Sequence, residues 1–206
     1  MTRGDEIEAL LFDVGQVILR VNVPRAARLL ADGAGKTPEQ VIAAIESDPQ
    51  MVSFQEGQLA AEEWHQHLRR SLGLRHSFEE FCRAWNSALE PEPLLGVEFF
   101  AALAPRLRLG LLSNTDPIHV QHFESHFEVV SLIPVRLYSC TEGMRKPAPA
   151  LYERAIAALG TAAEKMLYMD DVEEFVEGGK RAGLQTYHCR DPAALSGHLR
   201  ERGLLR

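Results

Sequence analysis

Six residues that could take part in catalysis or ligand binding stand in four separate parts of the chain, each after a stretch typical of a buried parallel strand. They are Asp13 in LLFDVGQV, Ser113 and Asn114 in LGLLSNT, Lys146 in GMRKPAP, and Asp170 with Asp171 in LYMDDVEE. Carboxylates can attack an electrophile or bind a cation, whereas a hydroxyl, an amide and an ammonium can bind an anion. Because the loops after parallel strands meet at one edge of a sheet, this order predicts a combined phosphate and metal site.

The first carboxylate, Asp13, ends the apolar run IEALLFD. An aspartate with an ordinary pKa of about 3.9 is ionised at neutral pH and needs no base to act as a nucleophile. Attack on a phosphoryl group would form an aspartyl-phosphate that water can open, which divides one difficult hydrolysis into two easier steps. Taken alone, Asp13 is explained equally well as a residue that caps a turn.

The tandem pair Asp170 and Asp171 also follows an apolar run, KMLYM. If both converged with Asp13, the three carboxylates would repel one another unless a cation lay between them. Mg²⁺ prefers oxygen ligands and commonly uses one or two carboxylates together with a substrate phosphate. For the pair in isolation, a solvated acidic turn at the start of a helix is the simpler alternative.

Two helix starts supply groups suited to an anion. Ser113 and Asn114 precede Asp116 and Pro117, which have the pattern of an N-cap and a first helical residue. Lys146 precedes the helical segment PAPALYERAIAALG, where its ammonium could reach both a phosphate and the nucleophile. Each of these short patterns is weak evidence when considered alone.

The elements that would hold these residues alternate between strand and helix patterns. The apolar segments IEALLFD, RLGLLS, VRLYS, KMLYM and LQTYH are separated by helical patterns, which predicts an α/β fold with a parallel sheet. Between about residues 22 and 93 four segments have helical periodicity with no strand between them, so we expect an inserted helical bundle. The proline-rich segment at residues 90–96 is expected to form the hinge by which the chain returns.

The composition favours a globular protein of modest size. The chain has 206 residues, 46% of them hydrophobic, and a formal net charge of −7. This charge gives no general attraction to nucleic acid or to anionic lipid, so a small diffusing molecule is the expected partner. The three cysteines are far apart in the sequence, which suggests neither a disulfide framework nor a zinc site. No apolar run approaches the roughly 18 residues of a membrane span. Both features predict a cytoplasmic protein. The oligomeric state is left open.

Taken together, the four motifs resemble those of the haloacid dehalogenase-like (HAD) hydrolase superfamily, over essentially the full chain. The resemblance rests on FDVGQVIL, LLSNT, RKPAPALY and YMDDVEE, in that order. It extends to the subgroup that includes bacterial α-D-glucose-1-phosphate phosphatases, which have FDxGxV and the string GMRKP. It implies a Rossmann-like core with helices on both faces, formed by residues 1–19 and 94–206, and a small helical cap formed by residues 20–93.

The resemblance also implies roles for individual residues. Asp13 would be both the nucleophile and a ligand of Mg²⁺, and the backbone carbonyl of Gly15 would be another ligand. Asp171 would bind the metal directly, and Asp170 through water or through Lys146. Ser113 and Asn114 would hold phosphate. Lys146 would also contact the phosphate and, as a second catalytic residue beside Asp13, would orient and neutralise the site.

One position departs from the pattern of most phosphatases of this superfamily. They carry a second aspartate two residues after the nucleophile, which protonates the leaving group, whereas this chain has Gly15. General acid–base assistance is worth about 10²–10⁴-fold, so we expect slow hydrolysis of esters with poor leaving groups. Gln16 can form hydrogen bonds but does not readily donate a proton, and water or a cap residue is expected to compensate.

Three functions are compatible with these residues. The first is a Mg²⁺-dependent phosphatase that acts on a small phosphorylated metabolite, with sugar phosphates among the candidates. The second is a 2-haloacid dehalogenase, since halide leaves without a proton, although the acidic pair would repel its anionic substrate. The third is a module that binds phosphate or metal without turnover.

The histidines in HVQHFESHF, at positions 119, 122 and 126, are expected to lie on a surface helix.

Overall fold

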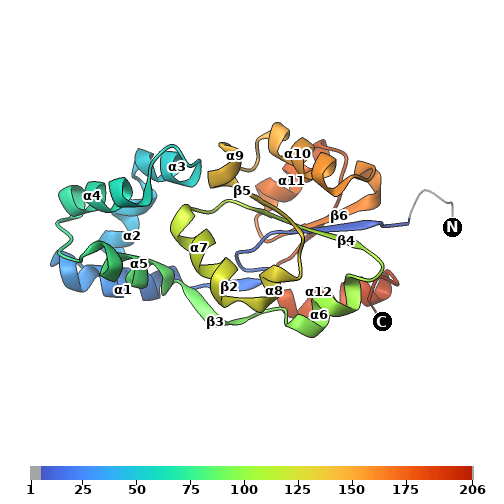
Figure 1. Ribbon diagram of the computed structural model, residues 1–206, viewed down its shortest axis with the longest axis horizontal. Helices are drawn as coiled ribbons and strands as arrows, with labels where there is room; N and C mark the ends of the chain where they lie inside the picture. The colour runs from blue at the N-terminus through green and yellow to red at the C-terminus, as the bar shows by residue number, and fades with distance from the viewer. Residues whose placement is uncertain (1–5, 206) are drawn as a thin grey trace.

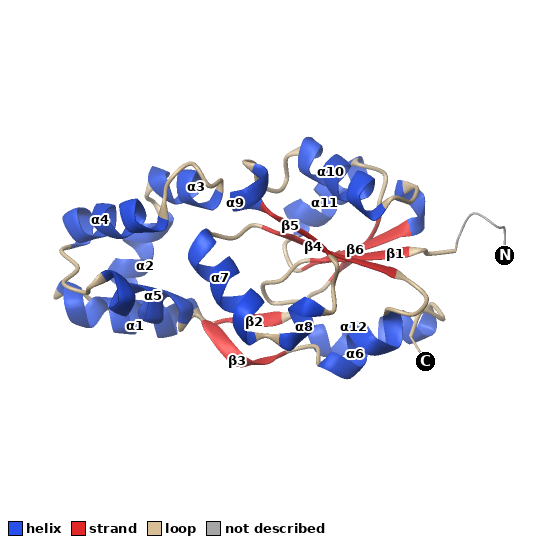
Figure 2. Cartoon of the chain, in the orientation of Figure 1, coloured by secondary structure: helices blue, strands red, loops and turns tan. Residues whose placement is uncertain are grey.

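The protein is described by a computed structural model that covers residues 6–205, with a five-stranded parallel sheet at its centre (Figures 1 and 2). The strand order is β5-β4-β1-β6-β7, so the first strand is the middle one. The predicted α/β class is confirmed, and the five apolar segments singled out in the sequence are the five strands. Their bounds are β1 Ala9–Phe12, β4 Arg108–Ser113, β5 Val135–Tyr138, β6 Met166–Asp170 and β7 Gln185–His188.

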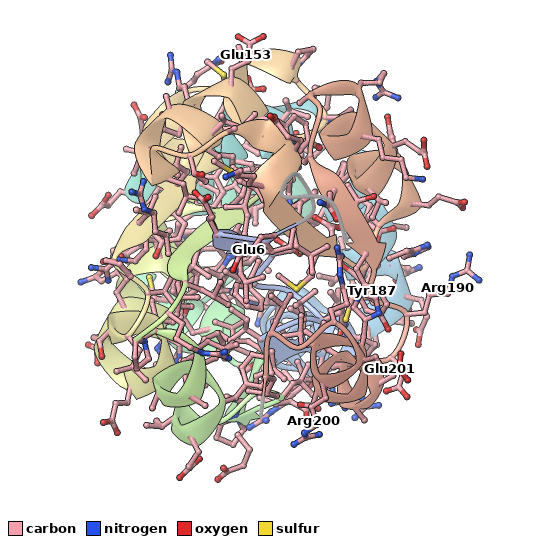
Figure 3. The ribbon with its side chains drawn as sticks, turned by 90° about the vertical axis from the view of Figure 1, so that its right-hand side faces the viewer. Glu6, Glu153, Tyr187, Arg190, Arg200 and Glu201 are labelled. Atoms are coloured by element: carbon pink, nitrogen blue, oxygen red, sulfur yellow. The ribbon has the colours of Figure 1, made fainter. Side chains whose placement is uncertain are left out.

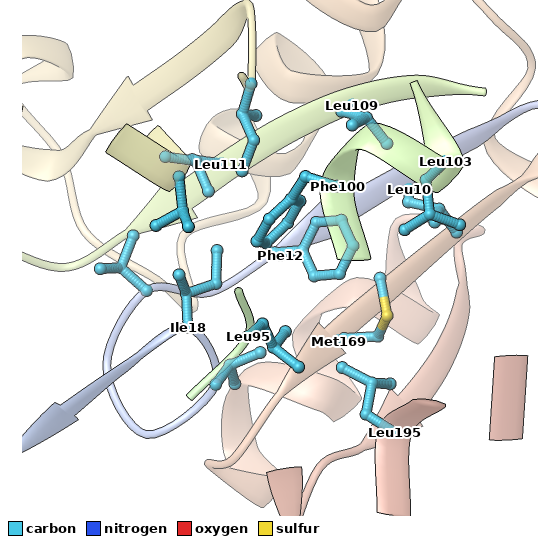
Figure 4. Packing of buried hydrophobic residues seen from close by; sticks show 14 of the residues in the cluster. Leu10, Phe12, Ile18, Leu95, Phe100, Leu103, Leu109, Leu111, Met169 and Leu195 are labelled. Atoms are coloured by element: carbon cyan, nitrogen blue, oxygen red, sulfur yellow. The ribbon is translucent and has the colours of Figure 1, made fainter. Parts of the chain in front are cut away.

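Both faces of the sheet are buried, which explains why the strands are apolar without alternation. Leu10 and Phe12 point to one face, where the Phe12 ring packs edge-on against Phe100 at 5.5 Å between centroids (Figure 4). Ala9 and Leu11 point to the other face. Helices α6 Val97–Leu103, α7 Pro117–His126, α8 Glu128–Ser131 and α12 Pro192–Glu201 contribute to the first cluster, and α10 Pro149–Leu159 to the second, beside α11 Glu173–Arg181.

A group of five helices follows the first strand and lies at one end of the molecule (Figure 1). It has its own apolar core, in which the Phe54 ring stacks on Trp64 at 5.3 Å. Thr37 and Ser77 start two of these helices with reciprocal capping bonds to Gln40 and Glu80. The helices are α1 Val23–Ala34, α2 Pro38–Glu46, α3 Pro49–Gln55, α4 Ala61–Leu72 and α5 Phe78–Asn86; α3 was not expected from the sequence.

The helical group is joined to the sheet by an antiparallel ribbon of two strands, β2 Leu19–Val21 and β3 Leu89–Pro93. Leu19 pairs with Pro93, and Val21 with Leu89. The proline-rich segment that was expected to be a hinge is therefore largely a strand, which is possible because an edge strand tolerates proline. The predicted domain boundaries fall within this ribbon, and the division into core and cap stays a prediction.

Two short elements complete the fold, α9 Ser139–Glu142 and the 3₁₀ turn Ala163–Lys165. At the end of the molecule away from the helical group, charged side chains such as Glu153, Arg190 and Arg200 point outward (Figure 3). Within residues 6–205, no helix is both long and apolar enough to cross a membrane.

Candidate active site

The predicted nucleophile lies just beyond the central strand. The backbone N–H of Asp13 still donates to the carbonyl of Met169 at 2.9 Å, so the residue is fixed by the sheet ladder. Its side chain is 11% exposed, and one oxygen, Oδ1, accepts a hydrogen bond from Lys146 Nζ at 2.8 Å. Asp13 is therefore held rigidly while its carboxylate keeps a small opening to solvent.

Asp170, at the end of the neighbouring strand β6, shares the same lysine. Its Oδ2 accepts hydrogen bonds from Lys146 Nζ at 2.6 Å and from the hydroxyl of Tyr168. Its Oδ1 accepts from the backbone N–H of Val172 at 2.8 Å. Both oxygens of this fully buried carboxylate thus have protein partners, and the ammonium of Lys146 joins it to Asp13.

The backbone of Lys146 is fixed by Asn114. The Asn114 amide donates to the Lys146 carbonyl at 3.0 Å, and its Oδ1 accepts from the Lys146 N–H at 2.8 Å. Asn114 was expected to hold phosphate, and its side chain positions the lysine. A phosphate contact through the Asn114 backbone N–H stays a prediction. The Lys146 ammonium also lies 5.0 Å from the centroid of the Phe175 ring, a cation–π contact.

Burial and the neighbouring opposite charges shift the pKa values of Asp13 and Lys146 in opposite directions. Burial, with a smaller contribution from the Asp170 charge, raises the pKa of Asp13 to about 6, although Lys146 opposes the rise. Burial disfavours the ammonium of Lys146, but Asp13 and Asp170 outweigh it and raise the pKa of this lysine. At neutral pH the nucleophile is therefore mostly ionised and the lysine is charged.

Three carboxylates meet in a way that suits a hard divalent cation. Asp13, Asp170 and Asp171 each offer an oxygen, and these oxygens lie within 4.8 Å of one another. Burial, together with the Asp170 charge, raises the pKa of Asp171. Three negative charges outnumber the single ammonium of Lys146, and oxygen atoms are the ligands that Mg²⁺ prefers. The donor set thus fits this metal.

The remaining predicted residues line one cavity beside the cluster: Gly15, Ser113 and Asn114. Ser113 ends β4, which is the neighbour of β1 in the sheet. The loop after it is held by Ser139, whose hydroxyl accepts from the Thr115 N–H and donates to the Thr115 carbonyl, both at 2.9 Å. The structure therefore brings all the predicted site residues to the carboxyl ends of β1, β4 and β6. Ser139 was missed because nothing in its local sequence distinguishes it.

A buried Asp–His pair next to this loop was also missed. Asp116 caps α7 through bonds of 3.0 Å from the N–H groups of Ile118 and His119. Its other oxygen accepts from the Trp85 indole at 3.1 Å and lies 2.8 Å from His119 Nδ1. His119 was expected on a surface helix, and that prediction is wrong: its side chain is 17% exposed and lines the cavity.

The charges of this pair stabilise each other. Burial alone would raise the pKa of Asp116, but the His119 charge and several hydrogen bonds lower it. Burial alone would lower the pKa of His119, but Asp116 raises it. Since Trp85 belongs to α5, the pair also ties the helical group to the loop that follows β4.

A comparison with protein-family models gives a match to the description "Hydrolase: haloacid dehalogenase-like hydrolase" over residues 7–183. The chain belongs to this family. The family resemblance seen in the sequence is thereby confirmed, and the protein is a HAD hydrolase.

A curated relative of this HAD hydrolase is D-ribitol-5-phosphate phosphatase from Bacteroides thetaiotaomicron. It is 25% identical over 198 residues, which cover 91% of this chain and 94% of the relative. A HAD family enzyme from the same organism, solved with magnesium and inorganic phosphate, has a TM-score of 0.79 at 22% identity; the match covers 88% of this chain and 93% of that one. L-2-haloacid dehalogenase from Xanthobacter autotrophicus has a TM-score of 0.61 at 20% identity, covering 87% and 76% of the two chains.

Proposed function

We propose that this HAD hydrolase is a Mg²⁺-dependent phosphatase that acts on a small phosphorylated molecule through an aspartyl-phosphate. The single observation that carries the proposal is the Lys146 ammonium, which lies 2.8 Å from an oxygen of Asp13 and 2.6 Å from one of Asp170. A lysine in that place offsets part of the negative charge of the acidic cluster. Its ammonium also lies beside the nucleophile, where it can contact a phosphoryl group. The curated phosphatase relative supports the same reaction class.

In this proposal Asp13 attacks phosphorus, and the bond from phosphorus to the alcohol oxygen breaks with its electron pair on that oxygen. Water then attacks the aspartyl-phosphate, which releases phosphate and restores the carboxylate. Lys146 holds Asp13 in the attacking position and offsets charge on the phosphoryl oxygens. Ser113, at the buried end of β4, and the backbone N–H of Asn114 bind the other phosphoryl oxygens.

The proposed metal ligands are Asp13, Asp171 and the carbonyl of Gly15, with Asp170 acting indirectly. The assignment of Asp171 as the direct ligand is supported by the hydrogen bonds of Asp170, both of whose oxygens already have protein partners. A bound Mg²⁺ would stabilise charge on the phosphoryl oxygens and permit an anionic substrate to approach anionic carboxylates.

The second candidate, a 2-haloacid dehalogenase, is supported by the structural likeness to such an enzyme. Displacement of halide needs no metal, however, and the substrate is itself a carboxylate. Three carboxylates within 4.8 Å of one another would repel it. The phosphatase is therefore the better proposal.

The deciding experiment measures phosphate release and halide release with Mg²⁺ or with a chelator, using the parent protein, Asp13→Asn and Asp32→Asn. Asp32 is an exposed residue of α1 and serves as the matched control. We expect phosphate release that needs both Mg²⁺ and Asp13 and that is unchanged in the control. Equal rates for the parent and Asp13→Asn would refute the nucleophile, and halide release in chelator would favour the dehalogenase. Mg²⁺ binding without release of either product would point to a binding module.

A further inference from the structure

The cavity lined by Gly15, Ser113 and Asn114 has a volume of about 260 Å³. Gly15 and Asn114 line it together with residues of α1, α2, α3, α5 and α7, of the β2–β3 ribbon and of the loop after β4. An apolar cavity of about 150 Å³ is enough to hold one benzene molecule. The space next to the nucleophile's loop can therefore accept an alcohol group with one or two rings.

The walls of this cavity are mainly hydrocarbon. Leu30, Ile45, Met51 and Leu89 supply aliphatic surface, and the Trp85 ring supplies aromatic surface. Val23, which is 45% exposed, adds an apolar residue where the cavity meets solvent. Burying hydroxyl groups against such walls is unfavourable unless each finds a hydrogen-bond partner.

Few polar side chains in the cavity are free to provide those partners. Asp116 is occupied by Trp85, by His119 and by the N-terminus of α7. His119 is likewise bound at both ring nitrogens, by Asp116 and by the Trp85 carbonyl at 3.2 Å. From the helical group, Glu46 and Gln55 are the polar residues that line the cavity, and Glu46 is exposed. A polyol would find partners in Glu46, Gln55 and the Thr115 hydroxyl and would bury its remaining hydroxyl groups against hydrocarbon.

A second, independent observation concerns the proton that a departing alcohol needs. A Cβ built on Gly15 would lie 3.9 Å from Asp13 Oδ2 and 3.5 Å from Val21 Cγ2, so this position borders both the nucleophile and the cavity. Because Gly15 has no side chain, no acid stands there. A phenol has a pKa of about 10, whereas an aliphatic alcohol is about as weak an acid as water, whose pKa is about 15.7. An aryl oxide is therefore a far better leaving group than an alkoxide.

From these two observations we propose that the substrate is the phosphate monoester of an apolar aromatic alcohol, whose ring occupies the cavity. The proposal rests on the phosphatase function above. Asp13 displaces an aryl oxide, which takes its proton from water after the phosphorus–oxygen bond has broken. Water then opens the aspartyl-phosphate, so the net reaction converts an aryl phosphate and water into a phenol and phosphate.

The first test compares kcat/KM for 2-naphthyl phosphate, cyclohexyl phosphate and D-ribitol 5-phosphate. Cyclohexyl phosphate is apolar but has a poor leaving group, so it separates the two observations. Without an acid we expect 2-naphthyl phosphate to exceed D-ribitol 5-phosphate by about 10²-fold or more, with cyclohexyl phosphate in between. A value for D-ribitol 5-phosphate equal to or above that for 2-naphthyl phosphate would overturn this proposal and leave the phosphatase function intact. No phosphate release from any ester would overturn both.

The second test restores the acid. The space around Gly15 accepts a Cβ at ordinary contact distances, so Gly15→Asp is expected to fold, and Gly15→Asn is its matched control. Relative to Gly15→Asn, Gly15→Asp should raise the ratio of kcat/KM for cyclohexyl phosphate to that for 2-naphthyl phosphate at least about tenfold. Equal effects of the two variants, or equal gains for both esters, would overturn the role assigned to the missing acid.

The third test changes the cavity wall. Ile45→Asn and, as a second variant, Met51→Gln should each lower the ratio of kcat/KM for 2-naphthyl phosphate to that for D-ribitol 5-phosphate about fivefold. Val52→Asn alters a 44% exposed side chain that does not line the cavity and serves as the control. An equal loss for both esters in both wall variants would show that the wall does not bind the ring and would overturn the proposal.

Discussion

Replacing Lys146 by Met tests the interpretation of the acidic cluster most directly. The Lys146 side chain is 1% exposed, and its ammonium lies 2.8 Å from Asp13 and 2.6 Å from Asp170. Methionine keeps most of the side-chain volume but leaves the two carboxylates buried without their cation. Removal of one partner of a buried ion pair costs about 3–5 kcal/mol, a large part of the roughly 5–15 kcal/mol by which proteins are stable.

The size of this loss should depend on pH and on Mg²⁺. Lys146 opposes the rise in the pKa of Asp13, so that pKa lies above about 6 in the variant. A carboxyl whose folded pKa is above its unfolded value of 3.8 destabilises the folded protein as the pH rises from the unfolded to the folded pKa. Because the parent has its own folded pKa at about 6, both proteins lose stability alike below that pH, and the gap between them should widen from about pH 6 upward. Mg²⁺ should narrow the gap, because the variant's site has one more net negative charge and binds the cation more tightly.

The assay is urea unfolding followed by circular dichroism, in chelator and in Mg²⁺. Lys180→Met is the control, because its ammonium is 54% exposed and its pair with Glu177 should be worth less than about 1 kcal/mol. Losses of equal size for the two variants in chelator would refute the reasoning. So would a gap for Lys146→Met that Mg²⁺ leaves unchanged.

Three further outcomes are expected. Mg²⁺ affinity, measured by titration calorimetry, should weaken as the pH falls below about 6, because protons then compete for Asp13; a constant affinity down to about pH 5 would contradict this. Asp116→Ala should cost about 2–4 kcal/mol in urea unfolding, because it removes a helix cap and leaves the Trp85 indole without a partner; a loss below about 1 kcal/mol would argue against it. Gly57→Ala should destabilise the protein more than Gly35→Ala, since both have positive φ but only Gly57 would place a Cβ against a backbone carbonyl, that of Cys140 at 1.9 Å; equal thermal shifts would exclude such a contact.

The sheet could be predicted from the sequence because each strand is buried on both faces. Such strands form continuous apolar runs, and Leu10 with Leu11 illustrates why: neighbours on opposite faces enter separate cores. The ribbon was harder to foresee, because β3 contains two prolines and only one of its five residues is buried. Its pairing with β2 depends on a partner some seventy residues away, which no local pattern reveals.

The convergence of Asp13, Lys146 and Asp170 could be expected from their places after strands, but the contacts that hold them could not. The contact between Tyr168 and Asp170 is the exception, because it could have been predicted from the sequence. Tyr168 stands two residues before Asp170 on the same strand, so the two side chains point to the same face. Asn114 was assigned to phosphate because it stands at a helix start, where free backbone N–H groups suit an anion, and its side-chain contacts were not foreseen. In the folded chain its polar atoms meet the backbone of Lys146, 32 residues away.

His119 was misplaced for a related reason. The histidines were assigned to a surface helix because no accompanying set of ligands appears in the sequence. The helix also has no apolar stripe that would distinguish an inner from an outer face. The inward position of His119 depends on Asp116 and on Trp85, which comes from a different part of the fold.

The paired ribbon has a consequence for how this protein could be re-engineered. Val21 and Leu89 stand opposite each other on one rung, so the chain leaves the sheet and re-enters it at neighbouring points. The five helices therefore connect two paired strands in the same way as the loop of a β-hairpin does. Another insert with closely spaced ends, or a tight turn, could therefore be grafted at this rung without altering the strand order beneath it.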